Sequence, residues 1–216
     1  MNITNFISCD KMNAITESIL QKAGISTDWQ GSVVKINIDV LIEFEYELEI
    51  EWKNIDHYSP GDTVLAAIIP KRKLIYLNDA KRDFFMEKMG TMNFSKAHEL
   101  GHWVLHVTYQ QDYEQLTFSD SETFFCRNQA KKPPQETQAD MFAAYILMPK
   151  DIITGAVNLL KKRGCVNFGN LYKLKDEFEV SISALKNRIQ DLGLLYFNDN
   201  IIYLNEAEAI GQMTLF

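Results

Sequence analysis

The sequence predicts an α+β fold in which a small antiparallel sheet is followed by an active-site helix, a ligand helix and a helical C-terminal part. Glutamates alternate with apolar residues between 43 and 52, which is the period of a strand. Two short apolar runs, 65–69 and 73–78, flank Pro70-Lys71-Arg72 and indicate two further strands. From residue 93 onward the apolar residues recur mainly at helical spacing.

Composition indicates a globular protein of one main domain. The chain has 216 residues, of which 46% are hydrophobic and 24% charged, and its formal net charge is −7. An acidic balance argues against broad nucleic-acid binding, which requires cations to replace phosphate counterions. No apolar run approaches the ~18 residues that a membrane span needs. The three cysteines, few and widely spaced, fit a reducing compartment, and no secretory signal opens the chain. We expect a cytoplasmic protein that does not bind membranes.

The first half combines one helix with the sheet. Residues 10–23 have helical apolar spacing, and Gly24 ends the pattern. In the alternating stretch 43–52 the glutamates would form a solvated face of a half-buried strand, although its first residues, from Asp39, also suit a helical turn. An acidic patch for a basic partner is the alternative interpretation of this face.

The second half predicts two long helices and a smaller extension. Residues 93–106 form the first helix, and the second begins at Pro134 or Gln135 and ends before Pro149. Residues 107–135 between them have no clear period. Residues 150–216 read as helical except for a strand-like run at 201–204. We predict one main domain at 1–150 and a helical extension at 151–216 packed on it.

The residues with most chemical information are His98, Glu99 and His102. Histidines at i and i+4 share one helical face and can hold one ion, and imidazole nitrogen is a good zinc ligand. Glu99 lies beside that face, where it could accept a proton from an activated water. The alternative is that the two histidines have partners in the helix core and bind no metal. However, three of the four histidines in the chain lie on this helix.

A catalytic zinc site normally has three protein ligands. His106 shares the face of the other histidines, but a straight helix places it about 12 Å along the axis from His98, too far for one ion, so we expect a core or outer-shell role. Glu136, at the start of the second helix, is the better third ligand. Asp140, one turn later, could accept the second ring N–H of a ligating histidine. A solvated acidic helix start is the alternative for this pair, and Cys126 is a weaker candidate for capping the metal.

Two blocks of the sequence resemble a known family. The run Phe94-Ser95-Lys96-Ala97-His98-Glu99-Leu100-Gly101-His102 and its continuation to His106 resembles the "F-T-x-A-H-E-L-G-H-x-x-L-H" block of the ImmA/IrrE metallo-endopeptidases. The run from Glu136 to Pro149 is similar to their "E-x-x-A-[ND]-x-F-A-A-x-L-L-M-P" block.

The resemblance implies a zincin-like fold of the gluzincin type that binds Zn²⁺. By motif match, His98, His102 and Glu136 would be zinc ligands, Glu99 the catalytic base and Asp140 an outer-shell partner. It also implies a zinc-dependent endopeptidase that cuts a regulatory protein at limited sites. Family members often cleave a helix-turn-helix repressor or a similar, antitoxin-like regulator, in stress responses or mobile elements.

Two other functions stay open from sequence. A metal-binding protein of this kind could control a repressor by contact without cleaving it. Residues 171–195 suggest two short helices joined at 179–181, with Ser181 as a cap, which a DNA-binding helix-turn-helix would also show. Because residues 151–216 carry seven basic and eight acidic residues, they lack a clustered basic face, and we expect a packing role instead of direct nucleic-acid binding.

Overall fold

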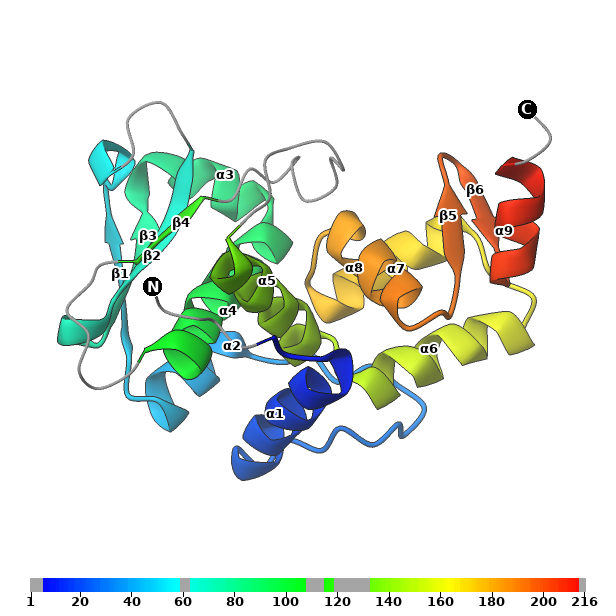
Figure 1. Cartoon of the computed structure of the whole chain (residues 1–216), viewed down its shortest axis with the longest axis horizontal. Coiled ribbons are helices and arrows are strands. Elements are labelled where there is room, and N and C mark those ends of the chain that lie inside the picture. The colour runs from blue at the N-terminus through cyan, green and yellow to red at the C-terminus, as the bar shows by residue number, and fades with distance from the viewer. Residues whose placement is uncertain (1–5, 59–62, 108–114, 119–132, 214–216) are drawn as a thin grey trace.

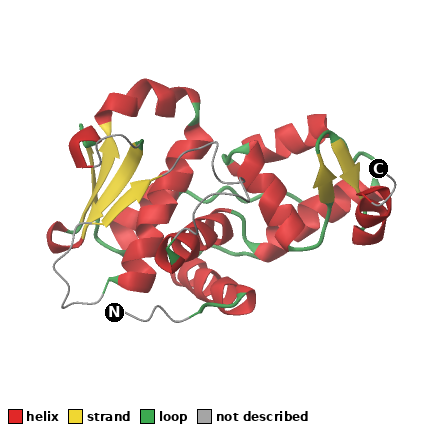
Figure 2. Cartoon of the chain, turned by 45° about the horizontal axis from the view of Figure 1, so that its top comes forward, coloured by secondary structure: helices red, strands yellow, loops and turns green. Residues whose placement is uncertain are grey.

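A computed structural model describes residues 6–58, 63–107, 115–118 and 133–213. It is a mixed α+β structure with a helical extension, as predicted. In Figure 1 a small sheet lies at one end, helices α4 (Met89–His106) and α5 (Pro134–Leu147) lie beside it, and the C-terminal elements lie at the other end. Figure 2 shows helices on one side of the sheet.

The sheet has four strands in the order β1-β3-β2-β4. The strands are β1 (Glu49–Lys53), β2 (Val64–Ile69), β3 (Leu74–Asn78) and β4 (Gln115–Phe118). Strands β2 and β3 are the two predicted apolar runs, joined by a 3₁₀ turn over Pro70–Arg72, and β2 pairs antiparallel with both β3 and β4. The sheet is not wholly antiparallel, because β1 joins β3 in parallel. Strand β4 falls inside 107–135, where the sequence indicated no element.

The strand predicted across 43–52 is correct only from Glu49 onward, and its first residues take the helical turn that was the alternative interpretation. The chain is helical over α2 (Ile38–Val40) and a π-helical turn (Leu41–Glu45), and the strand begins at Glu49. Asn37 caps the helical part, because its side-chain oxygen accepts a hydrogen bond from the backbone of Asp39 at 3.2 Å. Glu47, with φ of 53°, then redirects the chain into β1. Within β1 the predicted alternation holds, with exposed glutamates and half-buried apolar residues.

The main core lies between the sheet and the helices. The first helices are α1 (Cys9–Lys22), close to the prediction, and the short α3 (Arg82–Glu87). Helix α4 contacts β2, β3 and β4 and packs along α5, and α1 packs on α5 from the other side. Ile68 and Ile75 of the sheet and Leu100 of α4 are completely buried in this core, together with Phe142 and Ile146 of α5. The two long helices therefore belong to the best-packed part of the molecule, where side chains hold fixed positions.

The C-terminal elements are helical apart from one hairpin. They are α6 (Lys150–Lys162), α7 (Phe168–Phe178), α8 (Ile182–Asp191), β5 (Tyr196–Asn198), β6 (Ile201–Tyr203) and α9 (Glu206–Met213). The predicted run at 201–204 is β6, and Ser181 caps α8 as predicted, accepting from Ala184 N at 3.1 Å. Helix α8 packs on α5 and α6. The division of the chain into two domains near residue 150 stays a prediction.

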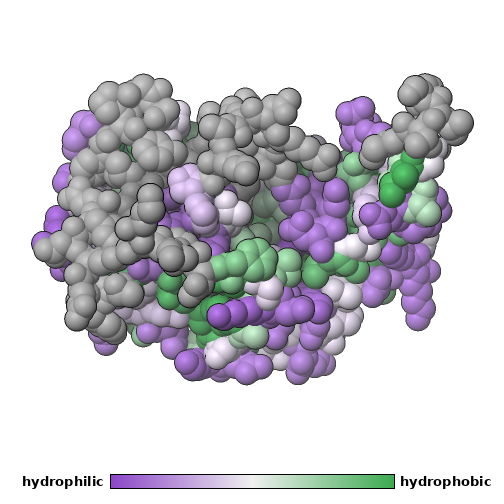
Figure 3. All heavy atoms as spheres, in the orientation of Figure 1, coloured by the Kyte–Doolittle hydropathy of each residue, from purple (hydrophilic) through white to green (hydrophobic). Residues whose placement is uncertain are grey.

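The described surface is largely polar on one face. Figure 3 shows the described part of one face as mainly hydrophilic, with hydrophobic residues gathered around α5. Among the described residues, no helix has the length and apolarity to cross a membrane.

Candidate metal centre

The site is built on the buried middle of α4. From Met92 to His102 every residue of this helix is buried, and the side chains of His98, Glu99 and His102 are at most 2% exposed. Buried imidazoles and carboxylates are costly unless they have polar partners. The helix therefore requires partners for three polar side chains within one and a half turns.

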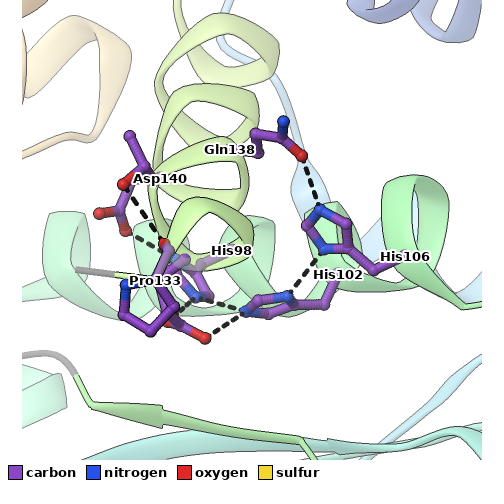
Figure 4. A network of polar contacts seen from close by, with 8 residues as sticks. His98, His102, His106, Pro133, Gln138 and Asp140 are labelled. Carbon is purple, nitrogen blue, oxygen red and sulfur yellow. Dashed lines mark hydrogen bonds and ion pairs between the residues drawn. The ribbon is translucent and has the colours of Figure 1, made fainter. Parts of the chain in front are cut away.

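Three candidate ligand atoms meet at one point between α4 and α5. The Nε2 atoms of His98 and His102 lie 2.9 Å apart, and each lies 3.3 Å from a carboxylate oxygen of Glu136. Among the described residues, these three form a group whose ligand atoms all lie within 4.8 Å of one another. Figure 4 shows both histidines rising from α4 toward the start of α5. The structure thus brings together the three residues predicted as ligands.

The spacing of these atoms fits a zinc ion. Zinc–ligand bonds of about 2.0–2.1 Å in a tetrahedron place ligand atoms about 3.3 Å from each other. Each histidine nitrogen has this separation from a different oxygen of the Glu136 carboxylate, and the histidine pair is slightly closer. Two nitrogens and one carboxylate form the donor set that a catalytic zinc uses, with a fourth position left for water or substrate.

Asp140 supports the first histidine, as predicted. Its Oδ1 lies 2.8 Å from Nδ1 of His98, where it accepts the N–H of that ring. With Nδ1 occupied by this hydrogen bond, the Nε2 atom is directed at the candidate metal position. Sequence reasoning placed Asp140 on the same face as Glu136, one turn later, and both reach His98.

Close packing of α4 on α5 brings the ligands together. A β-carbon on Gly101 would lie 3.1 Å from two atoms of Phe142 and 3.2 Å from the Cα of Ala139. The absence of a side chain at Gly101 therefore lets α5 approach α4. Because Glu136 lies three residues before Ala139, this approach places its carboxylate next to the histidines.

His106 does not join the candidate ligands. Its Nδ1 lies 3.1 Å from Nδ1 of His102, on the side of that ring away from Glu136, and its Nε2 lies 2.9 Å from Oε1 of Gln138. This agrees with the expected outer-shell position. The contribution of Gln138 was missed by sequence reasoning.

In the metal-free protein the ligands form a charged cluster. Burial acts to lower the pKa of His98, but hydrogen bonds to Asp140 and Glu136 outweigh it and raise that pKa to about 10. Burial lowers the pKa of His102 to about 4. Burial acts to raise the pKa of Glu136, but hydrogen bonds to the two histidines bring it well below its usual range. A cation at this point would take over the role of the His98 proton as partner of Glu136.

Glu99 is set apart from this cluster. Its side chain is 0% exposed, and among the described residues neither carboxylate oxygen has a hydrogen-bond partner of normal geometry. Burial raises its pKa to about 8, and the positive charge of His98 and the backbone of Ile68 on β2 only partly oppose this. A carboxyl group with a pKa near neutrality is suited to both accepting and donating a proton.

Two sequence hypotheses concern other parts of the chain. Cys126, and most of the segment 107–135 around it, lie outside the described residues. The paired helices α7 and α8 are present, but α8 turns Leu185, Arg188 and Ile189 into the interior. Its buried side therefore packs on the rest of the molecule, and the absence of direct nucleic-acid binding stays a prediction.

The α+β fold with an active-site helix, a ligand helix and a convergent His/His/Glu group defines a zincin-like metallopeptidase domain. The chain belongs to the IrrE N-terminal-like domain family (Peptidase_M78), whose model matches residues 46–190. This confirms the family predicted from the two motifs and indicates a peptidase of metallopeptidase type. No curated protein matches the chain.

Proposed function

We propose that this protein is a zinc-dependent endopeptidase that cleaves a regulatory protein, such as a helix-turn-helix repressor or an antitoxin-like regulator, at a limited number of sites. The observation that carries the proposal is the convergence of His98 Nε2, His102 Nε2 and the Glu136 carboxylate beside the buried carboxyl group of Glu99. Membership of a peptidase family supports the reaction class. The substrate class rests on the resemblance of the two motif blocks to the ImmA/IrrE endopeptidases.

In this mechanism His98, His102 and Glu136 would hold the zinc ion. A zinc ion bound there supplies polarisation of the scissile carbonyl and lowers the pKa of water. Glu99 accepts a proton from the attacking water on a carboxylate oxygen and then donates it to the nitrogen of the leaving amine. Asp140 keeps the His98 ring in the orientation that zinc binding requires, through the 2.8 Å hydrogen bond to Nδ1.

The test separates metal binding from chemistry. Glu99→Gln removes the proton-accepting oxygen but leaves all three ligands, so we expect about one zinc per chain and a 10²- to 10⁴-fold loss of cleavage rate. Glu136→Ala removes a ligand, so we expect loss of zinc as well as cleavage. Zinc is measured by elemental analysis. Cleavage is followed by mass spectrometry on purified helix-turn-helix repressors as candidate substrates.

Each result has a distinct meaning. Full cleavage by Glu99→Gln would overturn the role of Glu99 as base. A wild-type protein that binds zinc and inactivates the repressor without new termini would favour control by contact. Unchanged zinc content in Glu136→Ala would show that the third ligand lies elsewhere.

A further inference from the structure

The two histidines at the candidate metal position use their second ring nitrogens differently. His98 Nδ1 contacts the Asp140 carboxylate directly at 2.8 Å. His102 Nδ1 instead contacts Nδ1 of His106 at 3.1 Å, and Nε2 of His106 contacts Oε1 of Gln138 at 2.9 Å. In Figure 4 this second chain runs from His102 through His106 to Gln138 on α5. Both histidines are thus backed by α5, one by a carboxylate and the other by a two-residue relay.

The donor and acceptor at each step of the relay follow from its last atom. The Oε1 atom of Gln138 is a carbonyl oxygen, which only accepts hydrogen bonds, so His106 must carry its proton on Nε2. A neutral imidazole has one N–H, so Nδ1 of His106 accepts. The partner nitrogen, Nδ1 of His102, must then donate.

This direction determines what His102 presents to a metal. With its proton on Nδ1, the neutral His102 ring has a lone pair on Nε2, which points at His98 and Glu136. If the relay ran in the opposite direction, His102 would carry its proton on Nε2, and that proton would occupy the position of the metal.

We propose that His106 and Gln138 are positioning residues that hold His102 in the Nδ1–H tautomer and so present its Nε2 lone pair to the zinc ion. The inference rests on the proposed zinc site and adds two residues to it. Helix α5 would then supply three groups to the site: the ligand Glu136, the partner of His98 and the end of the relay to His102.

The relay can be interrupted and restored at both of its members. Gln138→Leu keeps the approximate volume but removes the acceptor, whereas Gln138→Glu keeps an acceptor oxygen. His106→Leu removes the acceptor for His102. In His106→Asn the side-chain amide has the position of the lost Nδ1 and can accept again. His57→Asn is the matched control, because His57 is exposed and lies in a different part of the chain, the 3₁₀ turn Asp56–Tyr58.

The measurement is the zinc affinity of the metal-free, full-length protein, determined by competition with a chromophoric chelator. Loss of an outer-shell partner typically lowers metal affinity by about 10- to 100-fold. We expect this loss in both leucine variants. In Gln138→Glu, His106→Asn and the control we expect zinc affinities within about threefold of wild type, a smaller change than the loss of an outer-shell partner causes. Circular dichroism of each variant establishes that it is folded.

A second readout does not depend on substitutions. Nitrogen-15 NMR of the histidine rings in the zinc-loaded wild-type protein should show His102 protonated at Nδ1 and His106 protonated at Nε2. Leucine variants with wild-type zinc affinity, or a His106 ring protonated at Nδ1, would overturn the inference. A wild-type protein that binds no zinc would instead overturn the proposed function, so the two failures are distinguishable.

Discussion

Gly101 of α4 faces Phe142 of α5 so closely that a β-carbon at Gly101 would lie 3.1 Å from both Cβ and Cδ1 of Phe142. Gly101 lies on α4 between His98 and His102, and it faces the helix that carries Glu136. The short distances between the ligand atoms therefore depend on the absence of a side chain at Gly101 as well as on the ligands.

Gly101→Ala should lower zinc affinity more than stability. Alanine favours the helix by up to about 1 kcal/mol relative to glycine, which offsets part of the steric cost. The new methyl group must still displace Phe142 or the backbone of Ala139, and so move Glu136 away from the histidines. We expect about a tenfold loss of zinc affinity, at the lower end of outer-shell effects.

Chelator competition and urea denaturation measure the two effects of Gly101→Ala. Gly211→Ala is the control, since a β-carbon there meets no atom within 4 Å. Zinc binding as tight as in wild type would show that α4 and α5 can separate without disturbing the ligands.

The sequence predicted most of the metal centre because its residues obey helical spacing. His98 and His102 share a face at i and i+4, and Glu136 and Asp140 do the same on the second helix. The structure brings the ligand atoms of His98, His102 and Glu136 within 4.8 Å of one another, and it places Asp140 against the other ring nitrogen of His98. Their roles in binding and catalysis stay predictions.

Gln138 was missed for a geometric reason. On a helical wheel it lies about 200° from Glu136, on the opposite side of α5. It reaches the site only because His106 extends the histidine row of α4 by one turn and meets its side chain on that side. Which helices cross, and where, is a tertiary property that the periodicity of one helix does not contain.

The strand at 43–52 shows the same limit in the fold. Alternation of glutamate and apolar residues satisfies a strand period over 43–52, yet the helical turn Leu41–Glu45 begins just before this stretch, where the neighbours Leu41 and Ile42 are both completely buried. Neighbouring buried residues suit a helical turn against the core better than a one-sided strand. The cap at Asn37 was the local signal for that turn.

Removing zinc should lower thermal stability without unfolding the protein. The contact between α4 and α5 is held by buried apolar residues such as Leu100, Phe142 and Ala143, which do not need a metal. Free zinc at a thousand times its Kd would stabilise the folded state by about 4 kcal/mol. At about 2–4 °C per kcal/mol for a chain of this size, a chelator should lower Tm by about 10 °C.

Calorimetry with and without chelator measures this shift, and circular dichroism reports the fold. The Tm of Glu136→Ala should not respond to the chelator. Complete loss of helical signal in the metal-free wild-type protein would show that the metal is required for folding.

Gly90→Ala should destabilise the protein strongly, because the start of α4 touches the turn between α7 and α8. A β-carbon on Gly90 would lie 2.4 Å from the carbonyl carbon of Val180 and 2.8 Å from the nitrogen of Ser181. These are backbone atoms, so a rotamer change cannot relieve the clash. We expect a loss of about 2 kcal/mol or more in the free energy of unfolding, within the range of overpacked cores.

Urea denaturation of Gly90→Ala beside Gly211→Ala gives the comparison. A loss of under 0.5 kcal/mol would be as small as that of an ordinary surface substitution. It would mean that the C-terminal helices can move away from α4 at little cost, which would favour two loosely joined domains.

Arg188→Ala should strongly destabilise the packing of the C-terminal helices. The guanidinium is completely buried, with Nη2 donating to Asn13 of α1 at 2.8 Å and Nε donating to the carbonyl of Met148 at 3.2 Å. It also lies 3.5 Å from the ring centre of Tyr145. Truncation leaves two buried acceptors without partners, at about 1–3 kcal/mol each, so we expect a loss of about 3 kcal/mol or more.

Arg188→Met tests which property of the side chain matters. Methionine still covers Tyr145 and removes a buried cation whose Nη1 has no partner among the described residues. Arg188→Ala also removes this cation but leaves a cavity beside Tyr145, so Arg188→Met should lose less stability than Arg188→Ala. Lys186→Ala removes a cation–π contact between a partly exposed lysine and Phe197, and it should cost about 1 kcal/mol or less. If Arg188→Ala were as stable as wild type in urea denaturation, the free-energy cost of burying the guanidinium would equal the stabilisation from its hydrogen bonds and packing. The attachment of α8 to the end of the ligand helix α5 would then depend on its apolar residues alone.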